Sequence, residues 1–238
     1  MINLMLGDCL ERMKEIPDGS VDMVLADPPY GTTACKWDSV IPFEPLWEQY
    51  RRVAKRNAAI VLTASQPFTS YLVMSNPNAF KYSAVWDKVN SASGLHAKIQ
   101  PLRSHEDVLV FGFARLPYNP QMEPAKPRVD KVRSIPNGEA FSGKSAERVY
   151  DNGGMKYPKS VWRFSNASQR GKVHPTQKPV ALMEYLIKTY TNEGETVLDN
   201  CMGSGTVGVA CKNLNRKFIG IEKDETYFKI AQDRIAAI

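Results

Sequence analysis

The 238-residue sequence has little of what membrane, metal-binding or disulfide-rich proteins need. Its four cysteines and three histidines form none of the closely spaced pairs that are typical of zinc sites or disulfide frameworks. No apolar run approaches the roughly 18 residues of a membrane span. The start, MINLMLGD, lacks the basic residues and long apolar stretch of a signal peptide. We therefore expect a cytoplasmic protein with no metal ion and no membrane association.

Acidic residues are scarce in one segment only. The whole chain carries 31 basic and 25 acidic residues, a net charge of +6. Residues 115–172 hold 12 Lys and Arg against 5 Asp and Glu, so this segment carries +7 and the rest of the chain −1. A confined basic excess favours contact with a polyanion such as nucleic acid.

Alternating apolar and amphipathic segments predict an α/β protein. The runs at 21–26 and 58–63 are apolar nearly throughout, as in strands that are buried on both faces of a parallel sheet. Further strands are expected at 2–6, 82–87, 107–112, 196–200 and 217–221, and helices at 9–15, 44–56, 180–190, 206–214 and 225–237, with another that has Ser65 as its N-cap. This alternation predicts a doubly wound, mainly parallel sheet.

Residues 115–172 interrupt this pattern. Six prolines and five glycines break every period, which indicates a loop-rich insertion rather than a hydrophobic layer, while its aromatic residues argue against simple disorder. We expect residues 1–114 and 173–238 to be two halves of one domain, with residues 115–172 inserted between them.

A glycine loop follows the predicted strand at 196–200 and opens a helix. Gly203–Thr206 supplies small residues that let a ligand approach backbone N–H groups, and Glu222, 19 residues beyond Gly203, is placed to bind ribose hydroxyls. This pattern alone fits NAD or any other adenosine-bearing cofactor. Asp199, however, disfavours a pyrophosphate and favours a ligand with ammonium and sulfonium groups, which is S-adenosylmethionine. Asp8 and Asp27 at other strand ends add to this acidic character.

The strand at 21–26 ends in Asp27-Pro28-Pro29-Tyr30. An exocyclic amino group is a poor nucleophile because its lone pair is delocalised into the ring. The Asp27 carboxylate and the Pro28 carbonyl can accept its two N–H hydrogens, and consecutive prolines fix the direction of that carbonyl. Tyr30 offers a face on which an extruded base can stack. Methylation at cytosine C5 is excluded because the chain has no Pro-Cys pair to supply a nucleophile.

Taken together, four motifs resemble those of the DPPY-type DNA amino methyltransferases. They are Asp27–Tyr30, Asp199 with Gly203–Thr206, Gly220-Ile221-Glu222, and His174-Pro175-Thr176-Gln177-Lys178-Pro179. Their order is similar to that of the beta class, in which the Rossmann-like methyltransferase sheet is circularly permuted. The resemblance implies an S-adenosylmethionine-dependent enzyme that acts on double-stranded DNA. Relatives of this class are often dimers, so it also implies a homodimer.

The resemblance assigns roles to individual residues. Asp27, Pro28, Pro29 and Tyr30 would be catalytic. The cofactor would be held by Asp8, Cys9, Asp27, Thr176, Gln177, Lys178, Pro179, Asp199, Cys201, Gly203, Ser204, Gly205, Thr206 and Glu222. The insertion would recognise the target through the basic residues Arg128, Lys131, Arg133, Lys144, Arg148, Lys156 and Lys159. The segment Arg103–Asp107 is expected near the cleft.

The predicted activity is methylation of adenine N6 in DNA. Cytosine-N4 methylation uses the same geometry, although family members of that type more often have Ser in place of Asp27. Methylation of an RNA or protein amino group is a further alternative. An NAD-dependent oxidoreductase would explain the glycine loop but not Asp27–Tyr30, and a DNA-binding module without activity would explain only the insertion. Neither the recognition sequence nor a partner nuclease is indicated.

Overall fold

The computed structural model describes residues 1–32, 38–91, 97–133, 147–166 and 177–238, with the backbone alone at 130–133 and 147–150. These residues form two compact units. Unit 1 comprises Met1–Asn119 and Ser160–Ile238, and unit 2 comprises Pro120–Lys159. In the described part of the chain, no helix has both the length and the apolar character needed to cross a membrane.

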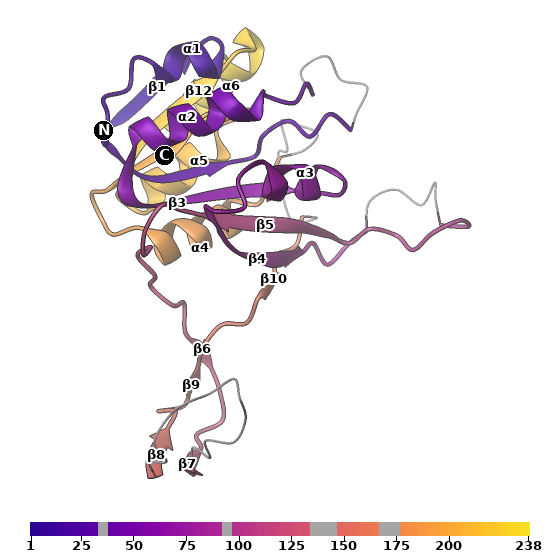
Figure 1. The fold of residues 1–238 in the computed structure, drawn as a ribbon, viewed down its shortest axis with the longest axis vertical. Coiled ribbons are helices and arrows are strands. Elements are labelled where there is room, and N and C mark those ends of the chain that lie inside the picture. The colour runs from indigo at the N-terminus through magenta and orange to yellow at the C-terminus, as the bar shows by residue number, and fades with distance from the viewer. Residues whose placement is uncertain (33–37, 92–96, 134–146, 167–176) are drawn as a thin grey trace. The chain divides into compact units, whose positions relative to one another are not determined.

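An eight-stranded sheet organises the described residues of unit 1 (Figure 1). In spatial order its strands are β1 (Ile2–Leu6), β12 (Lys217–Glu222), β11 (Thr196–Asp199), β2 (Val21–Ala26), β3 (Ala54–Ala64), β5 (His105–Phe111), β4 (Phe80–Asp87) and β10 (Val161–Arg163). Neighbouring strands are parallel except that β5 runs antiparallel to both β3 and β4. The predicted mainly parallel sheet is confirmed.

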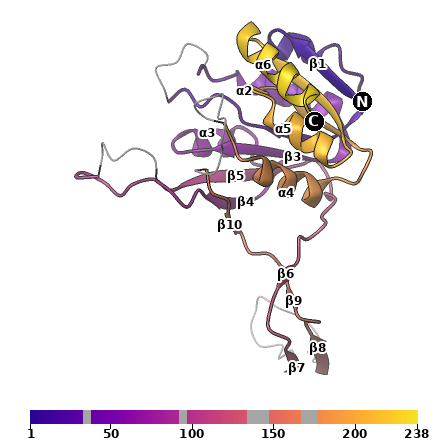
Figure 2. The same cartoon turned by 180° about the vertical axis from the view of Figure 1, so that it is seen from behind.

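Helices cover both faces of this sheet, as the opposite views in Figures 1 and 2 show. One face carries α1 (Cys9–Met13), α2 (Phe43–Val53) and α3 (Phe68–Ser75), and the other carries α4 (Val180–Tyr190), α5 (Thr206–Asn213) and α6 (Glu225–Ala236). Strand β2 shows why both layers are stable. Val24 and Ala26 pack with the first set of helices, whereas Met23 and Leu25 pack with the second, so alternate side chains of one apolar strand serve two cores.

Strands β11 and β2 lie side by side near the centre of the sheet, and the helices that follow them lie on opposite faces. Helix α5 follows β11 on one face, and α2 follows β2 on the other. In doubly wound sheets, a ligand crevice forms outside the carboxyl ends of the strands at such a switch point. The strand with the Asp27 motif precedes the strand of the glycine loop along the chain, as expected for the permuted sheet.

Unit 2 contains two short antiparallel ladders. Strand β6 (Glu123–Pro124) pairs with β9 (Met155–Lys156), and β7 (Val129–Arg133) pairs with β8 (Glu147–Asp151). Turn-forming glycines connect these strands, with Gly153 and Gly154 at positive φ between β8 and β9. The unit lies within the insertion that the sequence predicts.

Some expectations from the sequence are wrong in detail. The helix expected at 44–56 ends at Val53, and residues 54–56 belong to strand β3. The insertion was predicted over 115–172, but β10 belongs to the main sheet and Trp162, only 9% exposed, packs in its core beside Tyr185. A three-residue strand has no detectable period, so only tertiary packing reveals it. Helix α3 begins at Phe68 with Pro67 as its N-cap rather than Ser65, whose hydroxyl instead accepts a hydrogen bond from Arg103.

Candidate active site

A cavity of about 640 Å³ opens in unit 1 at the carboxyl ends of the parallel strands. Asp8 follows β1, Glu222 ends β12, Asp199 ends β11 and Asp27 follows β2, and all four line this cavity. Their strands are neighbours and run in the same direction, so residues from opposite ends of the sequence meet at one edge of the sheet. The expected cluster of four carboxylates is therefore present.

The antiparallel strand β5 adds residues to the same edge. It starts where the parallel strands end, and this places Arg103 and Glu106 in the cavity lining, together with Lys88, which follows β4. The Glu106 carboxylate pairs with Lys88 Nζ at 2.6 Å. The expectation that the segment 103–107 lies near the cleft is confirmed, and the reversed direction of β5 is the reason.

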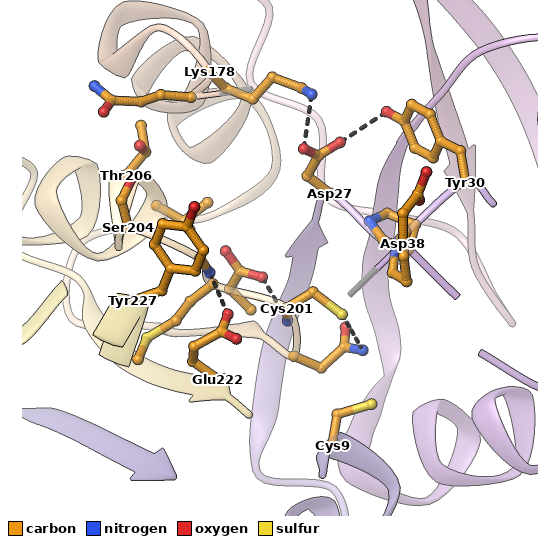
Figure 3. A pocket seen from close by; sticks show the side chains of 18 of the residues that line it. Cys9, Asp27, Tyr30, Asp38, Lys178, Cys201, Ser204, Thr206, Glu222 and Tyr227 are labelled. Carbon is orange, nitrogen blue, oxygen red and sulfur yellow. Dashed lines mark hydrogen bonds and ion pairs between the residues drawn. The ribbon is translucent and has the colours of Figure 1, made fainter. Parts of the chain in front are cut away.

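Asp27 is held by Tyr30, three residues along the chain, and by Thr63 and Lys178 from distant parts of the chain. Figure 3 shows the contacts with Tyr30 and Lys178. Its Oδ1 accepts hydrogen bonds from the hydroxyls of Tyr30, at 2.7 Å, and Thr63. Its Oδ2 accepts from Lys178 Nζ, also at 2.7 Å. The carboxylate is thus oriented and its charge is balanced before any ligand binds.

Lys178 is a buried cation between two acids. The side chain is 7% exposed, and its Nζ lies 2.7 Å from Asp27 Oδ2 and 3.2 Å from Glu106 Oε2. Burial alone would lower the pKa of this ammonium, but the charges of Asp27 and Glu106 outweigh it and raise the pKa above its ordinary value. Lys178 therefore stays charged at neutral pH.

Tyr30 is fixed by packing as well as by its hydrogen bond. Its ring stacks on Phe68 with centroids 5.1 Å apart and an interplanar angle of 23°. Burial, reinforced by the charge of Asp27, raises the pKa of its hydroxyl well above the ordinary value. The hydroxyl consequently remains a donor to Asp27, and Phe68 leaves only the opposite ring face for a stacking base.

Asp199 has very different surroundings. It is 3% exposed, and its Oδ1 accepts the backbone N–H of Cys201 at 3.0 Å. Among the described residues no cationic side chain pairs with it. Burial raises its pKa well above the ordinary value, and the charges of Asp27 and Glu222 raise it further, against the opposing effect of the Cys201 hydrogen bond. This carboxylate lacks a counter-charge.

Glu222 shapes the glycine loop. Its two oxygens accept the backbone N–H groups of Gly203, at 2.8 Å, and Asp224, at 2.9 Å. A carboxylate oxygen can accept two hydrogen bonds, so each still has capacity for a ligand hydroxyl. At Gly205, which has φ +79°, a Cβ would lie 2.9 Å from Ala231 Cβ, so close packing explains this glycine.

Other predicted cofactor residues are partly engaged within the protein. Asp8 caps α1 by accepting the Leu10 N–H at 2.9 Å. Cys201 Sγ accepts a weak hydrogen bond from Asn200, which in turn accepts from the Tyr50 hydroxyl at 2.7 Å. These contacts hold Asp8, Asn200 and Cys201 in the cavity lining.

The structure brings most of the predicted site together. The cavity is lined by Asp8, Cys9, Asp27, Pro28, Pro29, Tyr30, Gln177, Lys178, Asp199, Cys201, Gly203, Ser204, Thr206 and Glu222. Gly205 and Pro179 lie outside the lining and are the N-caps of α5 and α4. Thr176 lies outside the described residues.

Sequence reasoning missed several lining residues. They include Asp38, Ser65, Trp86, Lys88, Asn166 and Tyr227. Asp38 is an example of why: it is only 8% exposed and accepts the N–H groups of Gly31 and Thr32, but nothing in its local sequence marks it. Arg103 and Glu106 differ from these residues, because the sequence places their segment near the cleft.

The predicted DNA-contacting residues lie in unit 2. Arg128, Lys156 and Lys159 are exposed, and Lys156 Nζ lies 3.0 Å from a Glu123 carboxylate oxygen across the β6–β9 ladder. Lys131, Arg133 and Arg148 fall in β7 and β8, where only the backbone is described, and Lys144 lies outside the described residues.

Comparison with known proteins gives consistent matches over nearly the whole chain. A family model described as DNA methylase matches residues 21–233. The "DNA adenine methyltransferase YhdJ" of Escherichia coli (strain K12) is 30% identical over 246 residues, which cover 96% of this chain and 81% of the relative. The "Type II methyltransferase M.HpaI" of Haemophilus parainfluenzae is 27% identical, over 98% of this chain and 73% of the relative.

A solved structure agrees with these matches. The M1.HpyAVI–SAM complex has 28% sequence identity to the chain and a TM-score of 0.69, and the match covers 99% of both chains.

Proposed function

Because the chain belongs to the DNA methylase family, we propose that it transfers a methyl group from S-adenosylmethionine to the N6 amino group of a flipped adenine in double-stranded DNA. One observation carries this proposal. The oriented carboxylate of Asp27 and the glycine loop between Asp199 and Glu222 line the same cavity. A group that accepts amino hydrogens and a loop that suits an adenosyl cofactor therefore lie in one cavity.

The residues present fit this cofactor. The cavity lining holds six carboxylates against four Lys or Arg side chains, and Asp199 has no cationic partner among the described residues. An ammonium or sulfonium group would supply the counter-charge that this buried acid lacks. Gly203 and Ser204 leave room for close approach to the backbone, and Glu222 retains capacity for ribose hydroxyls. When bound, S-adenosylmethionine supplies an electrophilic methyl group.

The chain's own groups prepare the amino nitrogen. Asp27 Oδ2 and the Pro28 carbonyl accept its two hydrogens and draw the lone pair out of conjugation with the ring. Pro29 stiffens the peptide that carries the acceptors, and Tyr30 and Thr63 hold the carboxylate in place. Catalysis in this scheme depends on positioning, and no covalent link to the protein forms.

Adenine is the target that the relatives support. YhdJ is named an adenine methyltransferase, and Asp rather than Ser stands at position 27. Cytosine-N4 methylation is not favoured. The order of the motifs supports assignment to the beta class, and the need for DNA and cofactor supports action in the cytoplasm. A homodimer is part of this proposal and can be checked by analytical ultracentrifugation.

Unit 2 is proposed to grip DNA beside the target base. Its exposed Arg128 and Lys159 belong to the segment that holds the chain's basic excess. Base extrusion requires that the flanking backbone be held, and cationic side chains do this through phosphate contacts.

The direct test is nucleoside analysis after incubation of the protein with labelled S-adenosylmethionine and unmethylated duplex DNA. Label in N6-methyladenine is expected, and Asp27→Ala serves as the inactive control. Label in N4-methylcytosine would refute the adenine assignment, and the absence of label from any nucleoside would refute the proposed function.

A further inference from the structure

The hydrogen-bond capacity of Asp27 identifies which atom receives the substrate. A carboxylate oxygen accepts two hydrogen bonds. Oδ1 already accepts two, from Tyr30 and Thr63, whereas Oδ2 accepts one, from Lys178. The remaining acceptor position of the side chain is therefore on Oδ2, immediately beside the ammonium group of Lys178.

Lys178 has a matching unused donor. Of its three N–H bonds, one reaches Asp27 Oδ2 at 2.7 Å and a second faces Glu106 Oε2 at 3.2 Å. Among the described residues no third hydrogen-bond acceptor is present. The ammonium also faces the rings of Tyr30 and Trp86, 5.8 and 6.0 Å from their centroids, and the side chain lines the cavity. The acceptor Asp27 Oδ2 and the donor Lys178 Nζ thus lie 2.7 Å apart in the cavity lining.

We propose that Asp27 and Lys178 read the edge of the target base together, with Asp27 Oδ2 accepting an amino hydrogen and Lys178 Nζ donating to the adjacent ring nitrogen. This inference rests on the proposed function. In adenine the amino group lies between two ring acceptors: N1, which is bonded to the same carbon, and N7, which lies one carbon further along the ring system. Guanine and thymine present a carbonyl oxygen instead, which would face the Asp27 carboxylate and be repelled. The pair therefore selects amino bases over keto bases.

Glu106 acts in this arrangement as a positioning residue. Its Oε1 pairs with Lys88 at 2.6 Å, while its Oε2 faces Lys178 and is buried without a hydrogen bond. Glu106 is thereby anchored on one side and attracts the Lys178 ammonium on the other. Lys178 is held between two acids, which directs its remaining donor without contact between Glu106 and the base.

The sequence resemblance assigned Lys178 to the cofactor instead, and the two roles make different predictions. A cofactor contact would affect the dissociation constant of S-adenosylmethionine. A base-reading donor affects discrimination at the ring nitrogen and leaves cofactor affinity nearly unchanged. Lys178 contacts Asp27, Glu106 and the rings of Tyr30 and Trp86, and these contacts favour the second role.

The deciding experiment uses base analogues. The target adenine is first mapped by sequencing methylated DNA, then replaced in duplexes by 1-deazaadenine or 7-deazaadenine, each of which lacks one ring acceptor. For the wild-type protein, one analogue is expected to lower kcat/KM about 10- to 100-fold relative to adenine, the usual discrimination of a good bidentate base contact. In Lys178→Met, that loss should shrink to within about threefold because the donor is absent.

Variants supply the second measurement. Lys178→Met should lower kcat/KM for natural DNA at least about 100-fold, as expected for a misplaced catalytic carboxylate, while the cofactor dissociation constant changes less than about threefold. Lys178→Arg, which keeps a charged donor, should recover part of the activity, and Glu106→Gln should fall between Lys178→Arg and Lys178→Met. A cofactor affinity that falls as much as kcat/KM would overturn the inference.

The analogue comparison on wild-type protein remains decisive even when Lys178→Met does not fold. Methyl transfer that is indifferent to both analogues would overturn this inference alone. The inference is also overturned when folded Lys178→Met loses as much kcat/KM with the analogue as the wild-type protein does. Absence of methyl transfer to any DNA by the wild-type protein would refute the proposed function and the inference with it.

Discussion

Asp27 and Asp199 line the same cavity but differ in every neighbour. Asp27 pairs with the Lys178 ammonium and accepts two hydroxyl hydrogen bonds. Asp199 is more deeply buried, accepts a backbone N–H from Cys201, and has no cationic partner in the described chain. The balanced acid suits a neutral amino group, and the unbalanced one suits a cation. One residue type thus serves two ligands, and the surroundings decide which.

The largest effect should come from removing the balanced acid. Asp27→Ala takes away the acceptor for the amino hydrogen and should lower kcat about 10²- to 10³-fold, as is usual when one preorganised catalytic group is lost. Cofactor affinity should change little, because the opposite wall of the cavity is intact. Single-turnover methylation together with calorimetric cofactor titration tests both parts. A kcat within tenfold of wild type would contradict the role of Asp27.

The reverse pattern is expected for the unbalanced acid. Asp199→Asn removes a buried charge that a cationic ligand would meet, and should weaken cofactor binding about 10- to 100-fold, equivalent to roughly 1.5–3 kcal/mol for a charged hydrogen bond. At saturating cofactor, kcat should fall less than in Asp27→Ala. If instead Asp199→Asn impairs only kcat, the two acids have been assigned to the wrong ligands.

Asp199 should lower the stability of the ligand-free folded protein at neutral pH. The raised pKa of Asp199 means that the folded state holds this proton more tightly than the unfolded chain does. Its stabilising effect is therefore present at acid pH and is lost as pH rises from the ordinary carboxyl value of 3.8 through the raised folded value. Ligand-free Asp199→Asn should consequently melt about 2–4 °C above wild type at neutral pH.

A pair of melting curves checks this expectation. Saturating S-adenosylmethionine should reverse the order, because the wild-type protein then gains more from binding than the variant does. If the ligand-free wild type and Asp199→Asn melt at the same temperature as each other, both at pH 4 and at pH 7.5, then Asp199 carries no such penalty.

The smallest effect concerns two lysines of unit 2 that also differ in their partners. Lys156 pairs with Glu123 at 3.0 Å, whereas Lys159 has no carboxylate partner in the described chain. Lys159→Ala should weaken DNA binding a few-fold and reduce the slope of log K against log salt by about 1. Lys156→Ala should do less, since its charge is already partly neutralised. Lys229→Ala, on α6 of unit 1, is the matched control.

Fluorescence anisotropy over a range of salt concentrations measures these slopes. Wild-type behaviour of Lys159→Ala would place target recognition on another surface.

Local sequence signals predicted most elements of the fold. The strand at 21–26 and the helix at 180–190 have the predicted bounds, and Asp224 caps α6 as expected, accepting the N–H groups of Thr226 and Tyr227. Continuous apolar runs, helical periods and capping residues are properties of neighbouring positions. Strand β10 has no such signal, because three residues suffice only when a sheet edge and a core position for Trp162 are already present.

By itself the sequence determined the chemistry that this protein carries: the carboxylate and prolines at 27–29, the glycine loop with its two acids, and a basic insertion. These are local patterns, whose residue types and spacing are sufficient. Only the tertiary structure decided which acid has a counter-ion. Lys178 reaches Asp27 across 151 residues, and the reversed strand β5 brings Glu106 to Lys178. Charge balance depends on distances of a few ångströms, and those exist only after the chain has folded.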